Sequence, residues 1–229
     1  MAEPDPPRVR TYHARRGRLG ARHHDSLQTI GRTWLVSESG EPVDPADLFG
    51  RAVPVVLDIG CGMGESTLAQ AGQAPDVGVI AIDVHTRGVA TLMRKAHRDG
   101  LTNVRVVHGD AVTFINERLQ SASVSGARVY FPDPWPKTRH RKRRLVQPEF
   151  VSLIADRLAP GGFLHCATDD AAYAEQMLEV LAAEPLLTNL HEGYAPAPTN
   201  PLASRPTTKF HARGQRLGHG VWDLVFARR

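Results

Sequence analysis

The stretch VPVVLDIGCGMG at Val53–Gly64 decides the fold. Its first part, Val53–Leu57, is a short run rich in β-branched residues and is typical of a buried strand. Its second part, Asp58–Gly64, indicates a tight turn that a ligand can approach closely, because glycine has no side chain to prevent either. A helix-compatible segment, Glu65–Ala71, follows. Taken alone, the glycine triplet fits a plain strand–helix connection equally well.

The alternation of strand and helix continues along the chain. Further strands are predicted at Val79–Ile82, Val104–Val107, Arg128–Phe131, Phe163–Ala167 and Val221–Phe226. Helices are predicted at Gly88–Arg98, Ala111–Leu119, Phe150–Leu158 and Ala171–Leu181, with a stop at Pro160-Gly161-Gly162. Short apolar runs between helices are typical of a buried parallel sheet. The pattern predicts a doubly wound, mostly parallel α/β sheet, which binds ligands at the carboxyl ends of its strands.

The length and composition fit one domain with a core of its own. The chain has 229 residues, of which 41% are hydrophobic, and this suffices for one core. We expect this domain over residues 33–229, after a flexible basic arm at residues 1–32 that is rich in Pro and Arg.

Several classes of protein are excluded by composition. The two cysteines, Cys61 and Cys166, are too few for a disulfide-stapled scaffold or a structural zinc site. The eleven histidines show no ligand spacing, so no metal is predicted. No apolar run reaches the roughly 18 residues of a membrane span, and the N-terminus lacks a secretory signal. We therefore expect a cytoplasmic protein, either monomer or homodimer.

Positive charge is concentrated in three segments although the net charge is only +4. Residues 1–32 hold seven Arg against three acids, residues 137–144 hold six cations and no acid, and residues 205–229 hold six cations and one acid. Basic segments on a roughly neutral body are a candidate footprint for a polyanion. Each basic segment alone is more typical of a solvated surface stretch. Three such segments beside a domain with candidate catalytic residues favour the binding of a polyanion.

Acidic residues after successive strands indicate the ligand of the glycine turn. The spacing is G-x-G-x-G with Glu65 next, so the dinucleotide fingerprint fails, and acids beside the turn suit a cationic ligand. The Asp83 carboxylate can accept hydrogen bonds from both hydroxyls of a ribose. The Asp110 carboxylate can accept a hydrogen bond from the amino group of adenine. Either one alone fits a helix N-cap better. Together with the turn they favour S-adenosylmethionine, a sulfonium nucleoside, over NAD or ATP.

A stiff loop, FPDPWPK at Phe131–Lys137, follows the fourth strand. Asp133 matches the N1–H and N2–H donors of guanine, and Trp135 offers a face for stacking. The alternative is that Trp135 simply packs against the protein. The basic run at residues 137–144 can then reach phosphates around the bound base. After the fifth strand, Thr168, Asp169 or Asp170 can cap the next helix. The alternative is that one of the two acids lies beside that base.

These motifs resemble the bacterial tRNA (guanine-N7)-methyltransferases from about Val53 onward. The most selective elements are FPDPWPK (131–137), RHRKRR (139–144), ATDD (167–170), RPTTKF (205–210) and RLGHGVWDL (216–224). The resemblance implies a Rossmann-like class I fold with a seven-stranded sheet. It also implies methyl transfer from S-adenosylmethionine to N7 of a guanine in the tRNA variable loop.

The resemblance also implies roles for individual residues. The implied cofactor contacts are Asp58, Gly60, Gly62, Gly64, Asp83, Asp110 and Asp133. Asp133 further resembles the catalytic residue. The implied substrate contacts are Lys137, Asp169, Thr208, Lys209, Phe210 and His211, to which the basic run adds Arg141 and Arg144. This chain departs from the family where Asp58, Asp83 and His211 stand in place of the usual Glu.

Three other functions compete with this prediction. Methylation of an adenine amine is one, because Asp133-Pro134-Trp135 superficially resembles the loop used for amino groups, although the second proline is missing. A non-catalytic RNA-binding protein should have lost the glycine turn and the acids, and both are present. An NAD-linked dehydrogenase is disfavoured by Glu65 in place of the third spaced glycine.

Overall fold

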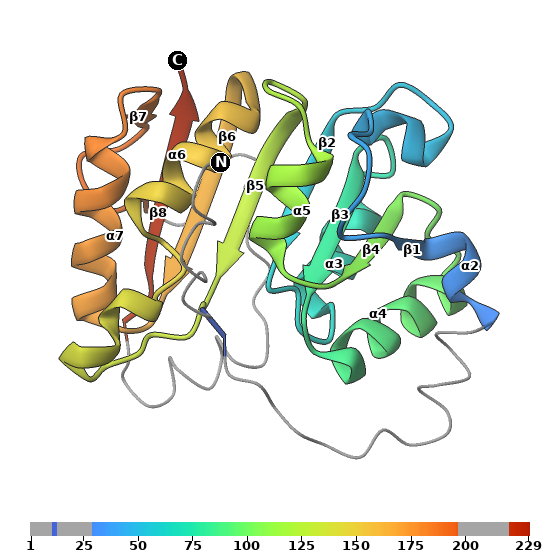
Figure 1. Ribbon diagram of the computed structural model, residues 1–229, viewed down its shortest axis with the longest axis horizontal. Coiled ribbons are helices and arrows are strands. Elements are labelled where there is room, and N and C mark those ends of the chain that lie inside the picture. The colour runs from blue at the N-terminus through green and yellow to red at the C-terminus, as the bar shows by residue number, and fades with distance from the viewer. Residues whose placement is uncertain (1–10, 13–28, 197–219) are drawn as a thin grey trace, which may run out of the picture.

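A computed structural model describes residues 11–12, 29–196 and 220–229 (Figure 1). Within them, an eight-stranded sheet has the order β1-β4-β3-β2-β5-β6-β8-β7. The strands are β1 (Leu35–Val36), β2 (Val55–Ile59), β3 (Gly78–Asp83), β4 (Val104–His108), β5 (Val124–Tyr130), β6 (Leu158–Thr168), β7 (Leu187–Asn189) and β8 (Trp222–Arg228). The pairs are parallel except those of β8, which runs antiparallel to β6 and β7. The predicted doubly wound, mostly parallel α/β sheet is therefore confirmed.

Helices cover both faces of the sheet. One layer consists of α5 (Ala111–Arg118), α6 (Pro148–Arg157) and α7 (Ala171–Ala183), which pack on the larger core cluster. The other consists of α2 (Gly31–Trp34), α3 (Glu65–Gln73) and α4 (Thr86–Arg98). Two 3-10 helices, η1 (Pro45–Phe49) and η2 (Thr138–Arg143), lie in connections. Because β2 is covered on both faces, all five of its residues are buried, as its continuous apolar run predicts.

The sheet of the described residues has eight strands, one more than the seven that the resemblance implies. The predicted runs correspond to six strands, and the two strands that no run predicted are the short ones, β1 and β7. They have two and three residues, and such short segments show no apolar periodicity that could distinguish them from loops.

The Pro160-Gly161-Gly162 segment does not directly follow a helix. The helix α6 ends at Arg157 and the chain enters β6 at once. The register between β5 and β6 shifts there, from Val124 opposite Leu158 to Gly126 opposite Phe163. Proline and glycine are tolerated inside this strand because the irregularity removes the need for a ladder hydrogen bond.

Candidate active site

The ends of neighbouring parallel strands bring most of the predicted site residues in the described part of the chain to one edge of the sheet, the lower edge in Figure 1. In the register, Ile59 of β2 lies beside Ile82 of β3 and Val129 of β5. The segments that follow these strands therefore start at the same level. The glycine turn follows β2, and the FPDPWPK loop follows β5.

The glycine turn between β2 and α3 has a left-handed backbone at every glycine. The φ angles are +78° at Gly60, +56° at Gly62 and +76° at Gly64, a region that side chains disfavour. A Cβ at Gly60 or Gly62 would meet nothing within 4 Å, whereas one at Gly64 would lie 2.6 Å from Leu92. The first two glycines thus leave the backbone open to a ligand, and the third is required by packing against α4.

Asp83, the last residue of β3, shapes this turn. Its Oδ2 accepts a hydrogen bond of 2.8 Å from the Gly62 backbone N–H, and its Oδ1 accepts one of 2.7 Å from His85. Each carboxylate oxygen has a second lone pair. The side chain can therefore hold the turn and still accept hydrogen bonds from ribose hydroxyls. The second of these roles is the one expected from the sequence.

Asp58 lies inside β2 and not in the turn, where the sequence placed it. It is 3% exposed, and its Oδ2 accepts a hydrogen bond of 2.5 Å from Thr67 Oγ1 on α3. Burial raises the pKa of this carboxyl, and the charge of Arg128 on β5 opposes that shift. In the structure Asp58 joins the sheet to the helix that follows the turn.

Asp110 caps α5, as the alternative interpretation of this residue expected. Its Oδ1 accepts hydrogen bonds of 2.9 Å from Val112 and 3.2 Å from Thr113. The Asp110 backbone N–H donates to Glu38 Oε2 at 2.7 Å. Sequence reasoning missed Glu38, which reaches this edge because β1 pairs with β4. No local motif marks it.

The FPDPWPK loop is strained and its tryptophan is packed. Phe131 and Trp135 have φ angles of +52° and +44°, which non-glycine residues rarely adopt. The Trp135 side chain is 5% exposed, its Nε1 donates to the Thr11 carbonyl at 3.2 Å, and the Arg143 guanidinium lies 4.7 Å from its ring centroid. The expectation that Trp135 offers a stacking face is therefore corrected in favour of the packed alternative.

A hydrogen-bonded chain of side chains supports the base of this loop. Tyr130 is the last residue of β5, and its hydroxyl lies 2.9 Å from His165 Nδ1. His165 Nε2 lies 2.7 Å from Asp223 Oδ1 on β8. Burial raises the pKa of Tyr130, so the phenol stays protonated. Three adjacent strands thus fix the residue from which the loop departs.

Of the remaining acidic residues of the candidate site, one caps a helix and the others are at least partly exposed. Asp170 caps α7 by accepting a hydrogen bond of 2.8 Å from Tyr173 N, whereas Asp169 is exposed. Asp133 is half-buried, and Lys137 and Arg141 are exposed. Asp133 and Asp169 follow adjacent strands, β5 and β6, whose register pairs Tyr130 with Ala167.

Arg144 differs from the rest of the basic run. Its side chain is 1% exposed and its guanidinium is bound by protein groups, including the Pro134 carbonyl at 2.7 Å. The expectation that Arg144 contacts phosphates is therefore wrong for this structure, because a buried guanidinium cannot reach a phosphate on the surface. The periodicity of a charge run does not show which member turns inward.

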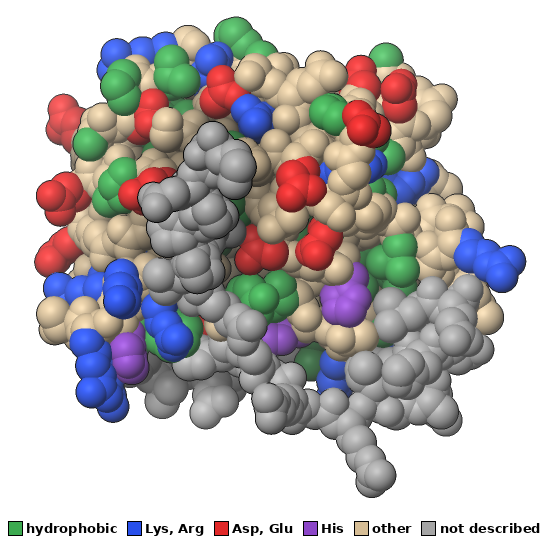
Figure 2. All heavy atoms as spheres, viewed as in Figure 1, with side chains coloured by type: hydrophobic (Ala, Val, Ile, Leu, Met, Phe, Trp, Pro, Cys, Tyr) green, Lys and Arg blue, Asp and Glu red, His purple; other side chains and the backbone are tan. Residues whose placement is uncertain are grey.

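The exposed cations of this run form a patch. Lys137, Arg139, Arg141 and Lys142 are exposed at or beside η2. Figure 2 shows blue side chains gathered at the lower left, where Figure 1 places η2. Acidic side chains lie along the neighbouring left edge of the molecule. The patch, which we call the η2 patch, borders the loop that carries Asp133.

Other predicted features lie outside the described part of the chain. Thr208, Lys209, Phe210 and His211 fall there, as does most of the basic arm at residues 1–32. Among the described residues, no cluster of three His, Cys, Asp or Glu side chains could hold a metal ion. The helices of the described ranges are too short or too polar to cross a bilayer.

Comparison with known proteins identifies the family. A family model described as "Putative methyltransferase" matches residues 52–224. The tRNA (guanine-N(7)-)-methyltransferase of Bordetella pertussis is 48% identical over 98% of this chain and 88% of its own length. The one from Streptomyces coelicolor is 50% identical over 96% of this chain and 81% of its own length.

The chain belongs to the tRNA (guanine-N(7)-)-methyltransferase family. Solved structures show that the fold of this methyltransferase is shared more widely. The 16S rRNA methyltransferase KamB aligns with a TM-score of 0.57 at 18% identity over 82% of this chain and 95% of its own. At that identity the likeness concerns the fold alone.

This methyltransferase uses S-adenosylmethionine as its methyl donor. The described residues fit that group on a structural ground. The turn backbone is open at Gly60 and Gly62, and the Asp83 carboxylate lies beside it, bonded to Gly62. An open backbone with a carboxylate at its rim suits a nucleoside that carries a positive charge better than one that carries a pyrophosphate.

Proposed function

We propose that this methyltransferase transfers a methyl group from S-adenosylmethionine to N7 of a guanine in the variable loop of tRNA. The observation that carries the proposal is the adjacency of β2 and β5, whose register pairs Ile59 with Val129. It sets the glycine turn and the Asp133 loop side by side at one edge of the sheet. The names of the relatives support the choice of tRNA and of N7.

When bound, S-adenosylmethionine supplies an electrophilic methyl group. Guanine N7 has a lone pair in the ring plane and carries no proton, so the chain need not provide a general base. Its task is positioning, which alone can supply a large part of a rate enhancement. In this proposal Asp133 accepts hydrogen bonds from N1–H and N2–H of the guanine. Its charge also favours the positive charge that develops on the purine.

Substrate binding uses the surroundings of Asp133. Asp169 is exposed at the end of the adjacent strand, where it can contact the same base. Lys137 and Arg141 belong to the η2 patch and can contact phosphates that flank the guanine. Thr208, Lys209, Phe210 and His211, as well as the basic arm at residues 1–32, stay predictions. We also propose that the enzyme acts in the cytoplasm.

The test is a transfer assay with labelled S-adenosylmethionine and unmodified tRNA transcript, followed by digestion to nucleosides. The expected product is 7-methylguanosine, and it should vanish when the variable-loop guanine is replaced. Labelled methyladenosine would instead favour the alternative function, methylation of an adenine amino group. Binding of tRNA without any labelled nucleoside would favour a non-catalytic RNA-binding protein.

A further inference from the structure

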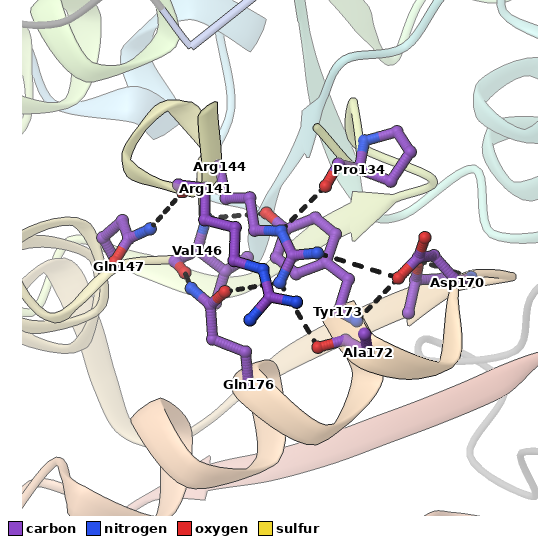
Figure 3. A network of polar contacts seen from close by, with 10 residues as sticks. Pro134, Arg141, Arg144, Val146, Gln147, Asp170, Ala172, Tyr173 and Gln176 are labelled. Carbon is purple, nitrogen blue, oxygen red and sulfur yellow. Dashed lines mark hydrogen bonds and ion pairs between the residues drawn. The ribbon is translucent and has the colours of Figure 1, made fainter. Parts of the chain in front are cut away.

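The buried side chain of Arg144 lies at the centre of a network of polar contacts that connects two parts of the candidate site (Figure 3). Its Nε donates to the Pro134 carbonyl at 2.7 Å, and its Nη1 donates to Gln176 Oε1 at 2.6 Å and to the Ala172 carbonyl at 3.3 Å. The guanidinium carbon also lies 4.5 Å from the ring centroid of Tyr173. A single side chain therefore holds the Asp133 loop against the start of α7.

The two segments that Arg144 joins each carry an acid expected to face the guanine. Pro134 directly follows Asp133, and α7 begins at Ala171, two residues after Asp169. Nη2 of Arg144 lies 3.8 Å from Asp170 Oδ1, an ion-pair distance, and that same oxygen caps α7. The position of Asp133 relative to Asp169 thus depends on the groups around this guanidinium.

The loop needs such a restraint because its backbone is strained. Pro134 lies between Phe131 and Trp135, the two loop residues with positive φ. Strained backbone persists only when the surroundings hold it. Phe131 is held by a hydrogen bond of 2.8 Å from its N–H to the Ala167 carbonyl. Arg144 provides the matching restraint on the far side of Asp133.

We propose that Arg144 is a positioning residue for methyl transfer, which fixes the Asp133 loop against α7 and makes no contact with tRNA phosphate. This inference rests on the proposed function of the site. The planar fork of arginine donates from several nitrogens at fixed angles, whereas a lysine ammonium is a point charge on a flexible stem. Arg144→Lys therefore keeps the charge but loses the simultaneous contacts with Pro134, Gln176 and Ala172.

Steady-state kinetics of Arg144→Lys separates the two roles of this arginine. A phosphate contact would survive the substitution, because lysine also binds phosphate. A positioning residue would not, and kcat at saturating tRNA and S-adenosylmethionine should fall by about a hundredfold, the cost of a misplacement of about 1 Å. The KM for tRNA should change far less. A wild-type kcat would overturn the proposal.

The matched control is Arg157→Lys, at the end of α6. Arg157 Nε donates to the Ile115 carbonyl at 3.2 Å, so this variant also exchanges a side chain that bonds a backbone carbonyl. It should lower the melting temperature with no change in kcat. If both variants lose kcat equally, Arg144 has only a general structural role and the proposal fails.

A second readout needs no RNA and no turnover. Hydrogen–deuterium exchange should become faster in the segment at residues 131–137 of Arg144→Lys, and unchanged protection there would overturn the proposal. If Arg144→Lys does not fold, Gln176→Ala removes one acceptor of the network and is judged by the same two criteria. If the wild-type enzyme forms no 7-methylguanosine, the proposed function fails, while the exchange experiment still decides whether Arg144 holds the loop.

Discussion

Thr67 Oγ1 donates a hydrogen bond of 2.5 Å to Asp58 Oδ2, and both side chains are buried. The bond joins the central strand β2 to α3 beneath the glycine turn. Replacing the hydroxyl by a methyl group of similar shape leaves a buried carboxylate without this donor. We expect Thr67→Val to lower the free energy of unfolding by about 1–3 kcal/mol. Urea unfolding measures this, with Ser66→Ala, which removes a neighbouring and less buried hydroxyl, as the control.

Asp58 should also make stability depend on pH. Burial raises the pKa of this carboxyl above its ordinary 3.8, so the folded state binds its proton more tightly than the unfolded state does. The stability from this difference is complete below pH 3.8 and is lost as the pH rises through the raised pKa. Asp58→Asn removes the titration. The melting temperature of the variant, relative to wild type, should therefore increase with pH, and a flat difference would contradict the burial argument.

The charge of Asp133 should matter for turnover more than for cofactor binding. Asp133→Asn keeps the size of the side chain, but its amide can accept at one atom only and carries no charge. We expect kcat to fall by about 10²–10³, as when one preorganised electrostatic contact is removed. Calorimetry should find the affinity for S-adenosylmethionine much less affected. Equal loss of both would mean that Asp133 holds only the cofactor.

The glycines of the turn should respond differently to alanine. Gly60→Ala meets no neighbour within 4 Å, so its cost is the left-handed φ alone, about 1–2 kcal/mol. Gly64→Ala adds a Cβ 2.6 Å from Leu92 and should destabilise the fold more. Thermal unfolding compares the two. Conversely, Gly60→Ala should weaken S-adenosylmethionine binding more than Gly64→Ala does at a temperature where both are folded.

The η2 patch should set the salt dependence of tRNA binding. Neutralising Arg139, Arg141 and Lys142 removes three exposed cations. For each phosphate that the protein then leaves without a cation, the slope of log K against log salt should become shallower by about 0.7–0.9. Fluorescence anisotropy at several salt concentrations measures the slope. The same slope in the triple variant as in wild type would show that tRNA binds elsewhere.

The sequence predicted the long elements of the fold and the place of two acids relative to the strands. Strands such as β2 and β3 have continuous apolar runs, because a central parallel strand is covered on both faces. Once these runs are identified in the sequence, residue numbers alone place Asp83 at the end of one strand and Asp133 shortly after the end of another. The predicted position of Asp58 was wrong because the predicted strand ended too early. The strand β2 extends to Ile59, so Asp58 lies inside the sheet and not in the turn.

Contacts between distant segments were not predictable in this way. Arg144 is indistinguishable from Arg141 within the basic run, and only the approach of α7 makes one buried and the other exposed. Trp135 looks like a stacking platform until its packing beside Arg143 is seen. Glu38 reaches Asp110 through the short β1–β4 pairing, which leaves no periodic pattern in the sequence.

The place of β8 constrains how the protein is made. It comes last in chain order among the described strands, yet it lies between β6 and β7. While the ribosome is still synthesising the segment before Trp222, β7 lacks the strand with which it pairs in the described sheet, and the edge of β6 is exposed. Unpaired strand edges favour association with other chains. We therefore expect incomplete nascent chains to depend on chaperones until β8 has emerged.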